Sequence, residues 1–141
     1  REEVFWTPGP GEFEVRGVEM EGSGDGYWTI ILDGWRVVWA MDGWKVSEKK
    51  KVEQLGQADV LFLTLNKDKK RAKEASELVK RISPYVVVPG MNWKDYEELE
   101  EKWPDKFLDE MDREDLKPKD KLKLSRSDIN EEATEIHLLT A

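Results

Sequence analysis

Asp42, Asn92 and His137 are the residues of this sequence whose type and position best fit a catalytic, ligand-binding or metal site. Asp42 directly follows an apolar run typical of a buried strand. Carboxylates at such positions bind metals or catalyse reactions, but they also form turns. Asn92, with Trp93 beside it, follows the apolar run Tyr85 to Pro89 in the same way. His137 is the one histidine of the sequence. A zinc site needs three or four ligands, so His137 is predicted to be structural or merely exposed.

Motifs for other kinds of chemistry are missing from the sequence. Gly22, Gly24 and Gly26 precede no predicted helix and no Gly-Lys-Ser/Thr tripeptide, so they do not predict a phosphate loop. The sequence has no cysteine, which excludes disulfides, cysteine-ligated zinc and thiol catalysis. No pattern pairs a nucleophile with a base. We therefore expect no catalytic residue and no cofactor, and we lean towards a protein that is not an enzyme.

The stretch that organises the chain is Tyr27 to Trp44, which holds four of the seven tryptophans. Two apolar runs flank Asp33-Gly34, a pair that favours a two-residue type I′ hairpin. Neither strand has a purely polar face, so both faces of the hairpin are expected to be covered. The aromatic side chains are either large core residues or an exposed surface that awaits a ligand or partner.

The second interpretation yields two sets of candidate residues. A binding site at the ends of adjacent strands would use Trp39, Asp42, Trp44, Asn92 and Trp93. An interface on the face of the sheet would use Trp28, Trp35 and Trp39.

The remaining elements follow from apolar periodicity and from turn and cap residues. Glu12 to Glu21 alternates as a strand whose parity changes at Gly17, which predicts a β-bulge there. A strand, a helix and a second strand then form a right-handed βαβ unit. Its ranges and those of the other elements are Ser47 to Leu55 (helix), Asp59 to Leu65 (strand), Asp68 to Ile82 (helix), Tyr85 to Pro89 (strand), Asp95 to Asp112 (helix broken at Pro104), and Lys121 to Arg126 and Thr134 to Leu139 (strands).

Length and charge limit the classes of protein that fit. At 141 residues we expect a single domain spanning residues 1–141. The net charge of -8 argues against non-specific binding to nucleic acid or to an anionic membrane. No apolar run is long enough to span a bilayer and no signal peptide precedes the fold. We therefore expect a cytoplasmic protein.

Motifs along the chain resemble those of small metallo-β-lactamase-fold hydrolases of the UlaG-like branch. The resemblance begins with PGEFEV and the Gly-Val pair that follows it, and runs in order through nearly the whole chain. The matching segments are Pro10 to Val18, the Asp33-Gly34 hairpin, Leu55 to Leu63, Ala72 to Ala75, Tyr85 to Pro89 and Phe107 to Asp128. This resemblance implies half of an αβ/βα sandwich, an α/β fold whose mixed sheet carries helices on one face.

The metal-binding motifs of that family are not retained. Its HxHxDH motif would precede Arg1, and its His-x-Gly-Asp segment here reads Trp39-Ala40-Met41-Asp42. Its later Pro-x-His segment reads Pro89-Gly90-Met91-Asn92. Asp42 is then a vestigial ligand at most, and we expect no bound metal. Such a loss fits a natural degenerate relative or an engineered derivative, and both interpretations stay open.

Half of a two-sheet sandwich would leave one apolar sheet face uncovered. We expect a second copy to cover it in a two-fold homodimer, as part of a metal-free structural or interaction protein. The competing outcome is that the chain from Asp95 onward folds over the face. The alternative functions are a small-molecule binding module built on the Trp cluster near Asp42 and Asn92, and a hydrolase half that needs a complementary N-terminal partner.

Overall fold

The computed structural model describes residues 11–15, 17–23, 25–46, 52, 55, 57–66, 68–91, 105–113 and 115–139, with the backbone alone for residues 12–15, 69 and 91. Seven strands and two helices follow one another through these residues, with one 3-10 turn near the end. They are β1 (Gly11–Val15), β2 (Val18–Gly22), β3 (Tyr27–Leu32), β4 (Trp35–Ala40), β5 (Val60–Leu65), α2 (Lys69–Ile82), β6 (Val86–Met91), α4 (Asp105–Glu110), the 3-10 turn η1 (Arg126–Asp128) and β7 (Glu135–Ile136).

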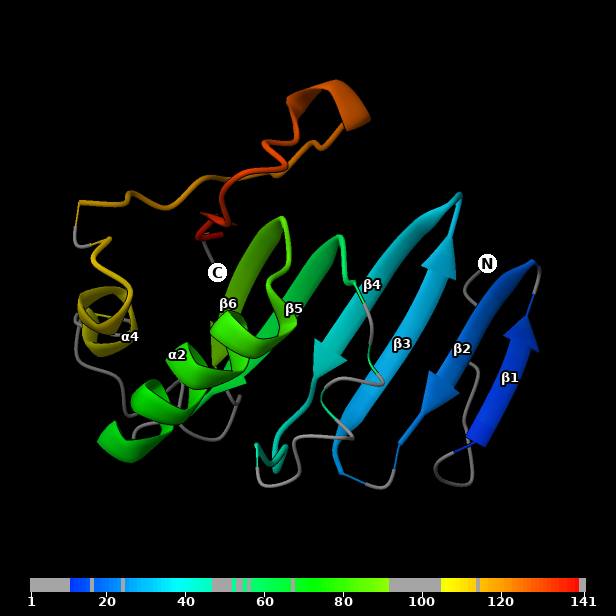
Figure 1. Ribbon diagram of the computed structural model, residues 1–141, viewed down its shortest axis with the longest axis horizontal. Helices are drawn as coiled ribbons and strands as arrows, with labels where there is room; N and C mark the ends of the chain where they lie inside the picture. The colour runs from blue at the N-terminus through cyan, green and yellow to red at the C-terminus, as the bar shows by residue number, and fades with distance from the viewer. Residues whose placement is uncertain are drawn as a thin grey trace.

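The strands form one mixed sheet in which spatial order follows sequence order from β1 to β7. Figure 1 shows this order from β1 to β6. The pairs from β1 to β4 are antiparallel. The pairs from β4 to β7 are parallel. The predicted α/β fold with a mixed sheet and helices on one face is therefore confirmed.

Two tight turns connect the antiparallel strands. Asp33 and Gly34 both have positive φ, 49° and 79°, and join Leu32 to its partner Trp35. This is the type I′ hairpin that the sequence predicted. The β-bulge predicted at Gly17 is wrong, because Val15 pairs with Val18 and Gly17, at φ 80°, lies in a second two-residue hairpin loop. A tight turn reverses the chain and changes side-chain parity just as a bulge does, so alternation by itself does not separate the two.

The predicted βαβ unit is confirmed as β5, α2 and β6, whose strands pair in parallel. Asp68 caps α2 by accepting a hydrogen bond from the Lys70 backbone N–H at 3.0 Å. Ser83 ends the helix in the left-handed conformation, and its N–H donates to the Val79 carbonyl. Caps at both ends satisfy backbone groups that an α-helix leaves without partners.

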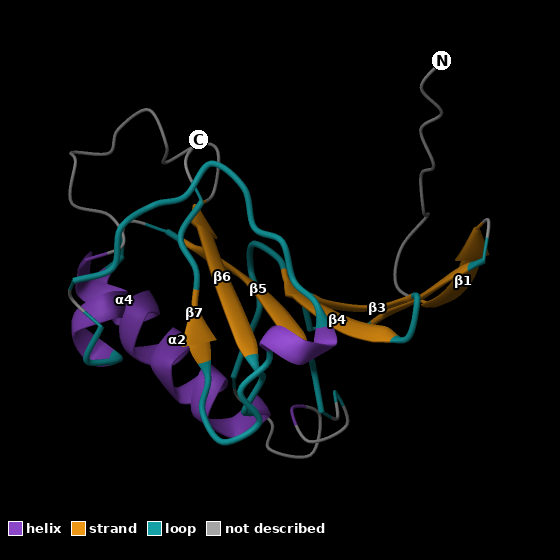
Figure 2. Ribbon diagram, turned by 90° about the horizontal axis from the view of Figure 1, so that it is seen from above, coloured by secondary structure: helices purple, strands orange, loops and turns teal. Residues whose placement is uncertain are grey.

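The helices and the C-terminal segment lie on opposite sides of the sheet (Figure 2). α2 and α4 share the main hydrophobic core with one face of the sheet. Residues 115–129, here called the strap, cross the other face, where Leu122 and Leu124 pack against Val60, Val86 and Val88. The strand predicted over Lys121 to Arg126 is therefore wrong. Burial alternates from Lys121 to Leu124 as expected, but this segment lies over the sheet instead of extending its ladder.

Several predicted elements meet the described residues only in part. The predicted strand Thr134 to Leu139 is represented by β7 and by an isolated bridge between Lys119 and Leu139. Of the predicted helix Ser47 to Leu55, Val52 and Leu55 are described, and both are buried. The helix predicted to start at Asp95 lies outside the described residues as far as Pro104.

Candidate functional site

The register of the sheet sorts its side chains into two faces of different character. Cross-strand partners point to the same face, so Trp28, Trp39 and Phe62 form one row and Met20, Ile30 and Val37 the next. Every described position of this face from β2 to β6 is uncharged. These positions are Val18, Met20, Gly22, Trp28, Ile30, Leu32, Trp35, Val37, Trp39, Val60, Phe62, Thr64, Val86, Val88 and Gly90. The opposite face carries the charged residues Glu19, Glu21 and Arg36 as well as the core beneath α2.

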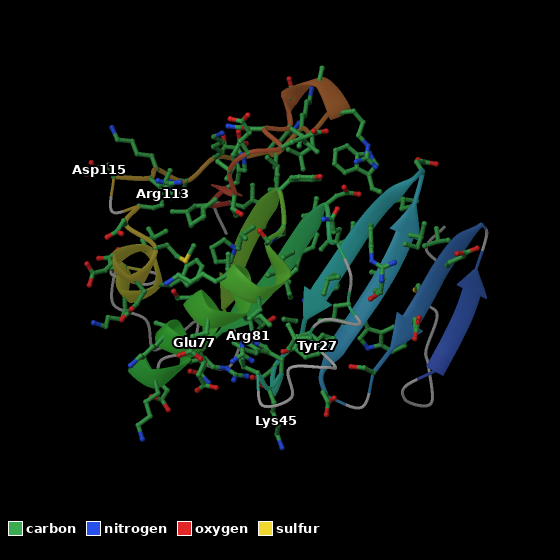
Figure 3. The ribbon with its side chains drawn as sticks, viewed as in Figure 1. Tyr27, Lys45, Glu77, Arg81, Arg113 and Asp115 are labelled. Atoms are coloured by element: carbon green, nitrogen blue, oxygen red, sulfur yellow. The ribbon has the colours of Figure 1, made fainter. Side chains whose placement is uncertain are left out.

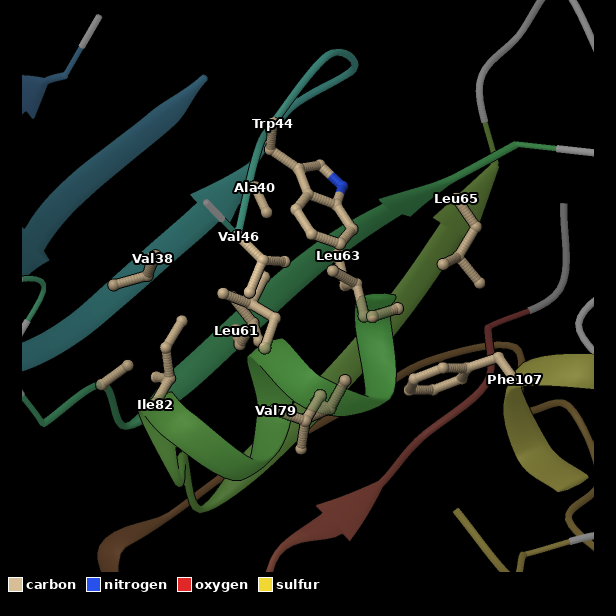
Figure 4. Close-up of a cluster of buried hydrophobic side chains, with 14 of the residues drawn as sticks. Val38, Ala40, Trp44, Val46, Leu61, Leu63, Leu65, Val79, Ile82 and Phe107 are labelled. Carbon is tan, nitrogen blue, oxygen red and sulfur yellow. The ribbon is translucent and has the colours of Figure 1, made fainter. Parts of the chain in front are cut away.

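Trp44 belongs to the helix-covered side and is a core residue. Its side chain is wholly buried and lies with Ala40 and Leu63 under α2 (Figure 4). The indole Nε1–H donates to the Thr64 carbonyl at 2.7 Å, and the Arg71 guanidinium carbon lies 3.7 Å from the ring centroid. This polar anchor and cation–π contact hold the ring in one orientation. For Trp44, the interpretation as a large core aromatic fits.

Tyr27 supports the same corner of the core. Its ring centroid lies 6.5 Å from that of Trp44, and its hydroxyl donates to the Lys45 carbonyl at 2.5 Å. Arg81 of α2 donates to the adjacent Val46 carbonyl at 3.0 Å. In Figure 3, Tyr27, Lys45 and Arg81 lie together in the lower part of the view. Burial raises the pKa of the Tyr27 hydroxyl well above its ordinary value, against the opposing effect of the nearby Arg71.

Asp42 lies in an exposed turn directly after β4. Gly43 takes φ 88° and the Trp44 N–H donates to the Met41 carbonyl, which closes the turn. Among the residues that the structure describes, no three His, Cys, Asp or Glu side chains gather into a possible metal site. The described donors therefore do not fit a catalytic metal at Asp42, which would need at least two further ligands. That the chain binds no metal stays a prediction.

The binding set predicted from the sequence is divided between different parts of the fold. Trp39 points to the face opposite Val38 and Ala40, which pack with Trp44 in the core. Asn92 and Trp93 lie outside the described residues. A binding role for these residues stays a prediction, but Trp39 and Trp44 do not line one pocket.

The interface set predicted from the sequence shares a single face. Trp28 and Trp39 are direct cross-strand partners, and Trp35 lies further along the same side of β4. Trp39 is 44% exposed and its ring contacts that of Phe62, 37% exposed, with centroids 6.0 Å apart. We call the part of this face that lies outside the strap, namely Met20, Trp28, Ile30, Trp39 and Phe62, the open face. Its residues are exposed or half-buried.

The strap covers the rest of the same face. Side chains on β5 and β6 that share the rows of the open face, Val60, Val86 and Val88, are buried beneath Leu122 and Leu124. Along the row of side chains that runs across the sheet from Trp39 through Phe62 to Val88, the exposed fraction therefore falls. Of the segment from Asp95 onward that was predicted to cover the sheet, the described strap covers this part of it.

Arg126 fastens the strap to the sheet. Its guanidinium donates to both carboxylate oxygens of Asp59, at 3.0 and 3.3 Å, and to the Gly34 carbonyl at 2.6 Å. Its carbon lies 4.2 Å from the ring centroid of Trp35. Asp59 also accepts from the Arg36 backbone N–H at 2.8 Å. The sequence contained no pairing signal for Arg126 and Asp59, which lie 67 residues apart.

His137 makes local polar contacts beside β7. Nε2 lies 3.1 Å from a Glu135 carboxylate oxygen, and Nδ1 lies 3.2 Å from the Lys119 ammonium nitrogen. The Lys119 N–H also donates to the Leu138 carbonyl. These contacts join the start of the strap to the last strand. That His137 is structural or merely exposed stays a prediction.

Comparisons with known proteins identify relatives that share this fold. A family model described as beta-lactamase superfamily domain matches residues 8–91. Among solved structures, a protein of Thermotoga maritima assigned to the Zn-dependent hydrolases of the metallo-beta-lactamase superfamily aligns with a TM-score of 0.66 and 21% identity. The alignment covers 93% of this chain and 70% of that one. A search of curated proteins finds no match. No helix among the described residues is long and apolar enough to cross a membrane.

Proposed function

The chain belongs to the beta-lactamase superfamily, and from that premise we propose that it is a non-catalytic interaction domain that binds a protein partner through the open face. The partner would rest on Trp28, Trp39 and Phe62 and exclude water from them. This proposal separates the fold, which the chain shares with hydrolases, from the chemistry that hydrolases perform on it.

The observation that carries the proposal is the contrast between the two faces of one sheet. The helix-covered face is a closed core with a fully buried Trp44. The open face keeps Trp39 and Phe62 in mutual contact and substantially exposed. Scattered exposed apolar residues are normal on proteins, but a contiguous patch over neighbouring strands is a feature of interaction sites. Aromatic residues are also the side chains that most often dominate binding energy at interfaces.

Hydrolysis is not favoured by the described residues. The relative from Thermotoga maritima is assigned as zinc-dependent, whereas the described residues of this chain include no group of three or more His, Cys, Asp or Glu side chains that could hold a metal ion. We derive no reaction step through a metal. The small-molecule alternative built on the Trp cluster near Asp42 and Asn92 is weakened because Trp39 and Trp44 lie on opposite sides of the sheet.

A second candidate function rests on the coverage of the relative. This chain covers 70% of that protein, so 30% of it (100 − 70) has no counterpart here. A separately supplied segment equivalent to that part would pack on the open face and serve as the N-terminal partner of a hydrolase. The cytoplasmic location expected from the sequence stays a prediction.

The proposal is tested with the fluorescent probe bis-ANS, which binds exposed apolar surface on folded protein. The native chain at nanomolar concentration should bind the probe, and Trp39→Glu should bind it at least several-fold more weakly. Leu139→Glu is the matched control, because Leu139 is also 37% exposed but lies beyond β7. Circular dichroism confirms that each variant is folded. Equal probe binding by the native chain and Trp39→Glu would refute the proposal.

A further inference from the structure

The proposed function, on which this inference rests, leaves open which protein covers the open face. We propose that the occupant is a second copy of this chain, packed face to face across a two-fold axis that runs along the strands. The inference draws on the charge of the face, its area and the position of the strap.

The charge pattern selects an apolar partner. Every described position of the face from β2 to β6 is uncharged, although the chain as a whole carries a net charge of -8. The charged residues of the same strands, such as Glu19 and Arg36, point to the other face. A basic or acidic partner would find no counter-charge here, whereas a second copy offers a matching charge-free surface. A two-fold axis brings identical patches together, as in most homodimers.

The area of the face suits a weak and reversible pair. A Trp or Phe side chain has on the order of 150–250 Å² of surface. At their exposures, Trp39 and Phe62 together offer roughly 150–200 Å². Leu32, which shares this face at the end of β3 and is 47% exposed, and the half-buried Met20, Trp28 and Ile30 raise the total to roughly 400–500 Å². Stable interfaces take about 600–1,000 Å² from each partner. The pair therefore falls at the low end, and we expect a dissociation constant on the order of micromolar.

The strap decides the direction of the two-fold axis. It lies over β5 and β6 on the same side as the open face (Figure 2). An axis perpendicular to the strands and parallel to the sheet would set the two straps against each other and hold the sheets apart. An axis along the strands places each strap over the β1–β2 side of the other copy. On that side of the sheet, the strap of the other copy would contact the half-buried Met20 and Val18.

This arrangement has the geometry of an ordinary two-layer packing. Sheets that pack face to face lie about 10 Å apart with their strands within about 30° of each other. Trp28 and Trp39 of both copies would lie near the axis, since β3 and β4 are the central strands of the uncovered region. Each strap would then form a rim around the partner's open face.

Sedimentation velocity from 1 to 200 µM tests the inference directly. We expect the mass to rise from 16.5 kDa towards twice that value with increasing concentration. Higher salt should tighten association several-fold, because it screens the repulsion between two chains of charge -8 while leaving the apolar contact intact. Trp39→Glu should weaken association at least tenfold, and Leu139→Glu should leave it unchanged.

Two further measurements keep the outcome decisive. Because the native sequence has no cysteine, Ile30→Cys should form a disulfide-linked dimer under mild oxidation and Leu139→Cys should not. Probe binding by bis-ANS should fall as protein concentration rises, because the second copy displaces the probe.

A mass of 16.5 kDa at 200 µM would overturn the dimer. If the probe still bound in a Trp39-dependent manner at every concentration, the open face would remain an interaction surface for a different occupant. A dimer unaffected by Trp39→Glu would overturn the inference by showing another interface. Absence of Trp39-dependent probe binding even at high dilution would overturn the proposed function as well.

Discussion

Replacing Arg126 with alanine tests how the strap is held to the sheet. The change removes the hydrogen bonds to both Asp59 carboxylate oxygens and to the Gly34 carbonyl, and the stacking contact with Trp35. The Asp59 carboxylate, whose side chain is only 12% exposed, then keeps the hydrogen bond from the Arg36 backbone N–H. An Asp left without its cation in such a position loses charge-assisted hydrogen bonding that water replaces only in part.

The expected loss of stability follows from these contacts. Hydrogen bonds to charged groups are worth about 1.5–3 kcal/mol, and a cation–π contact at an exposed site adds about 0.5–1 kcal/mol. Because the Arg126 side chain is 53% exposed, solvent screens the pair, and we expect a total of about 2–3 kcal/mol. For a chain of this size, that corresponds to a fall in Tm of roughly 5–10 °C.

Urea unfolding followed by circular dichroism measures the change in unfolding free energy. Lys123→Ala is the control, since Lys123 is an exposed cation on the same strap. A double-mutant cycle with Asp59→Asn should give a coupling of about 1–2 kcal/mol between Arg126 and Asp59. A loss below about 0.5 kcal/mol for Arg126→Ala, or a coupling near zero, would refute the reasoning.

Three other predictions follow from described residues and the sequence. Gly22→Ala should cost about 1–2 kcal/mol, because its Cβ would lie 2.7 Å from the Trp28 ring; thermal melts should show no such cost for Gly90→Ala, whose Cβ meets nothing within 4 Å. The raised pKa of Tyr27 means that the folded chain keeps a proton that the unfolded chain releases near pH 10. Stability should therefore be fully present below pH 10 and fall above it, and in Tyr27→Phe this alkaline slope should be shallower. Purified protein should carry no stoichiometric zinc, iron or manganese; elemental analysis finding about one metal per chain would contradict the loss of the ligand set.

Local patterns predicted much of the fold because they are governed by interactions between near neighbours. The Asp-Gly pair at residues 33–34 predicts a turn with positive φ, and both residues adopt it. The cap at Asp68 and the apolar stripe behind it predict α2, which spans Lys69–Ile82. The apolar runs on either side predict β5 and β6 as buried parallel strands.

Patterns with more than one structural solution were less reliable. A change of parity at Gly17 fits a bulge and a hairpin equally, and the choice depends on whether Val15 finds Val18 as a cross-strand partner. The alternation in Lys121 to Arg126 correctly indicates extended backbone with one apolar side. Whether that backbone joins the ladder or lies across the sheet depends on where the rest of the strap lies, which no local rule specifies.

By itself, the sequence determined the βαβ unit and the aromatic hairpin at Asp33-Gly34, since these depend on residue type and spacing. Only the tertiary structure decided which tryptophan is buried in the core and which lies on the open face. Trp39 and Trp44 are five residues apart, yet the turn after β4 carries Trp44 beneath α2, while strand parity leaves Trp39 on the other side. The pairing of Arg126 with Asp59 and the coverage of β5 and β6 by the strap also come from tertiary structure. Such contacts join segments far apart in the chain, and their energies depend on distances that exist only once the sheet has formed.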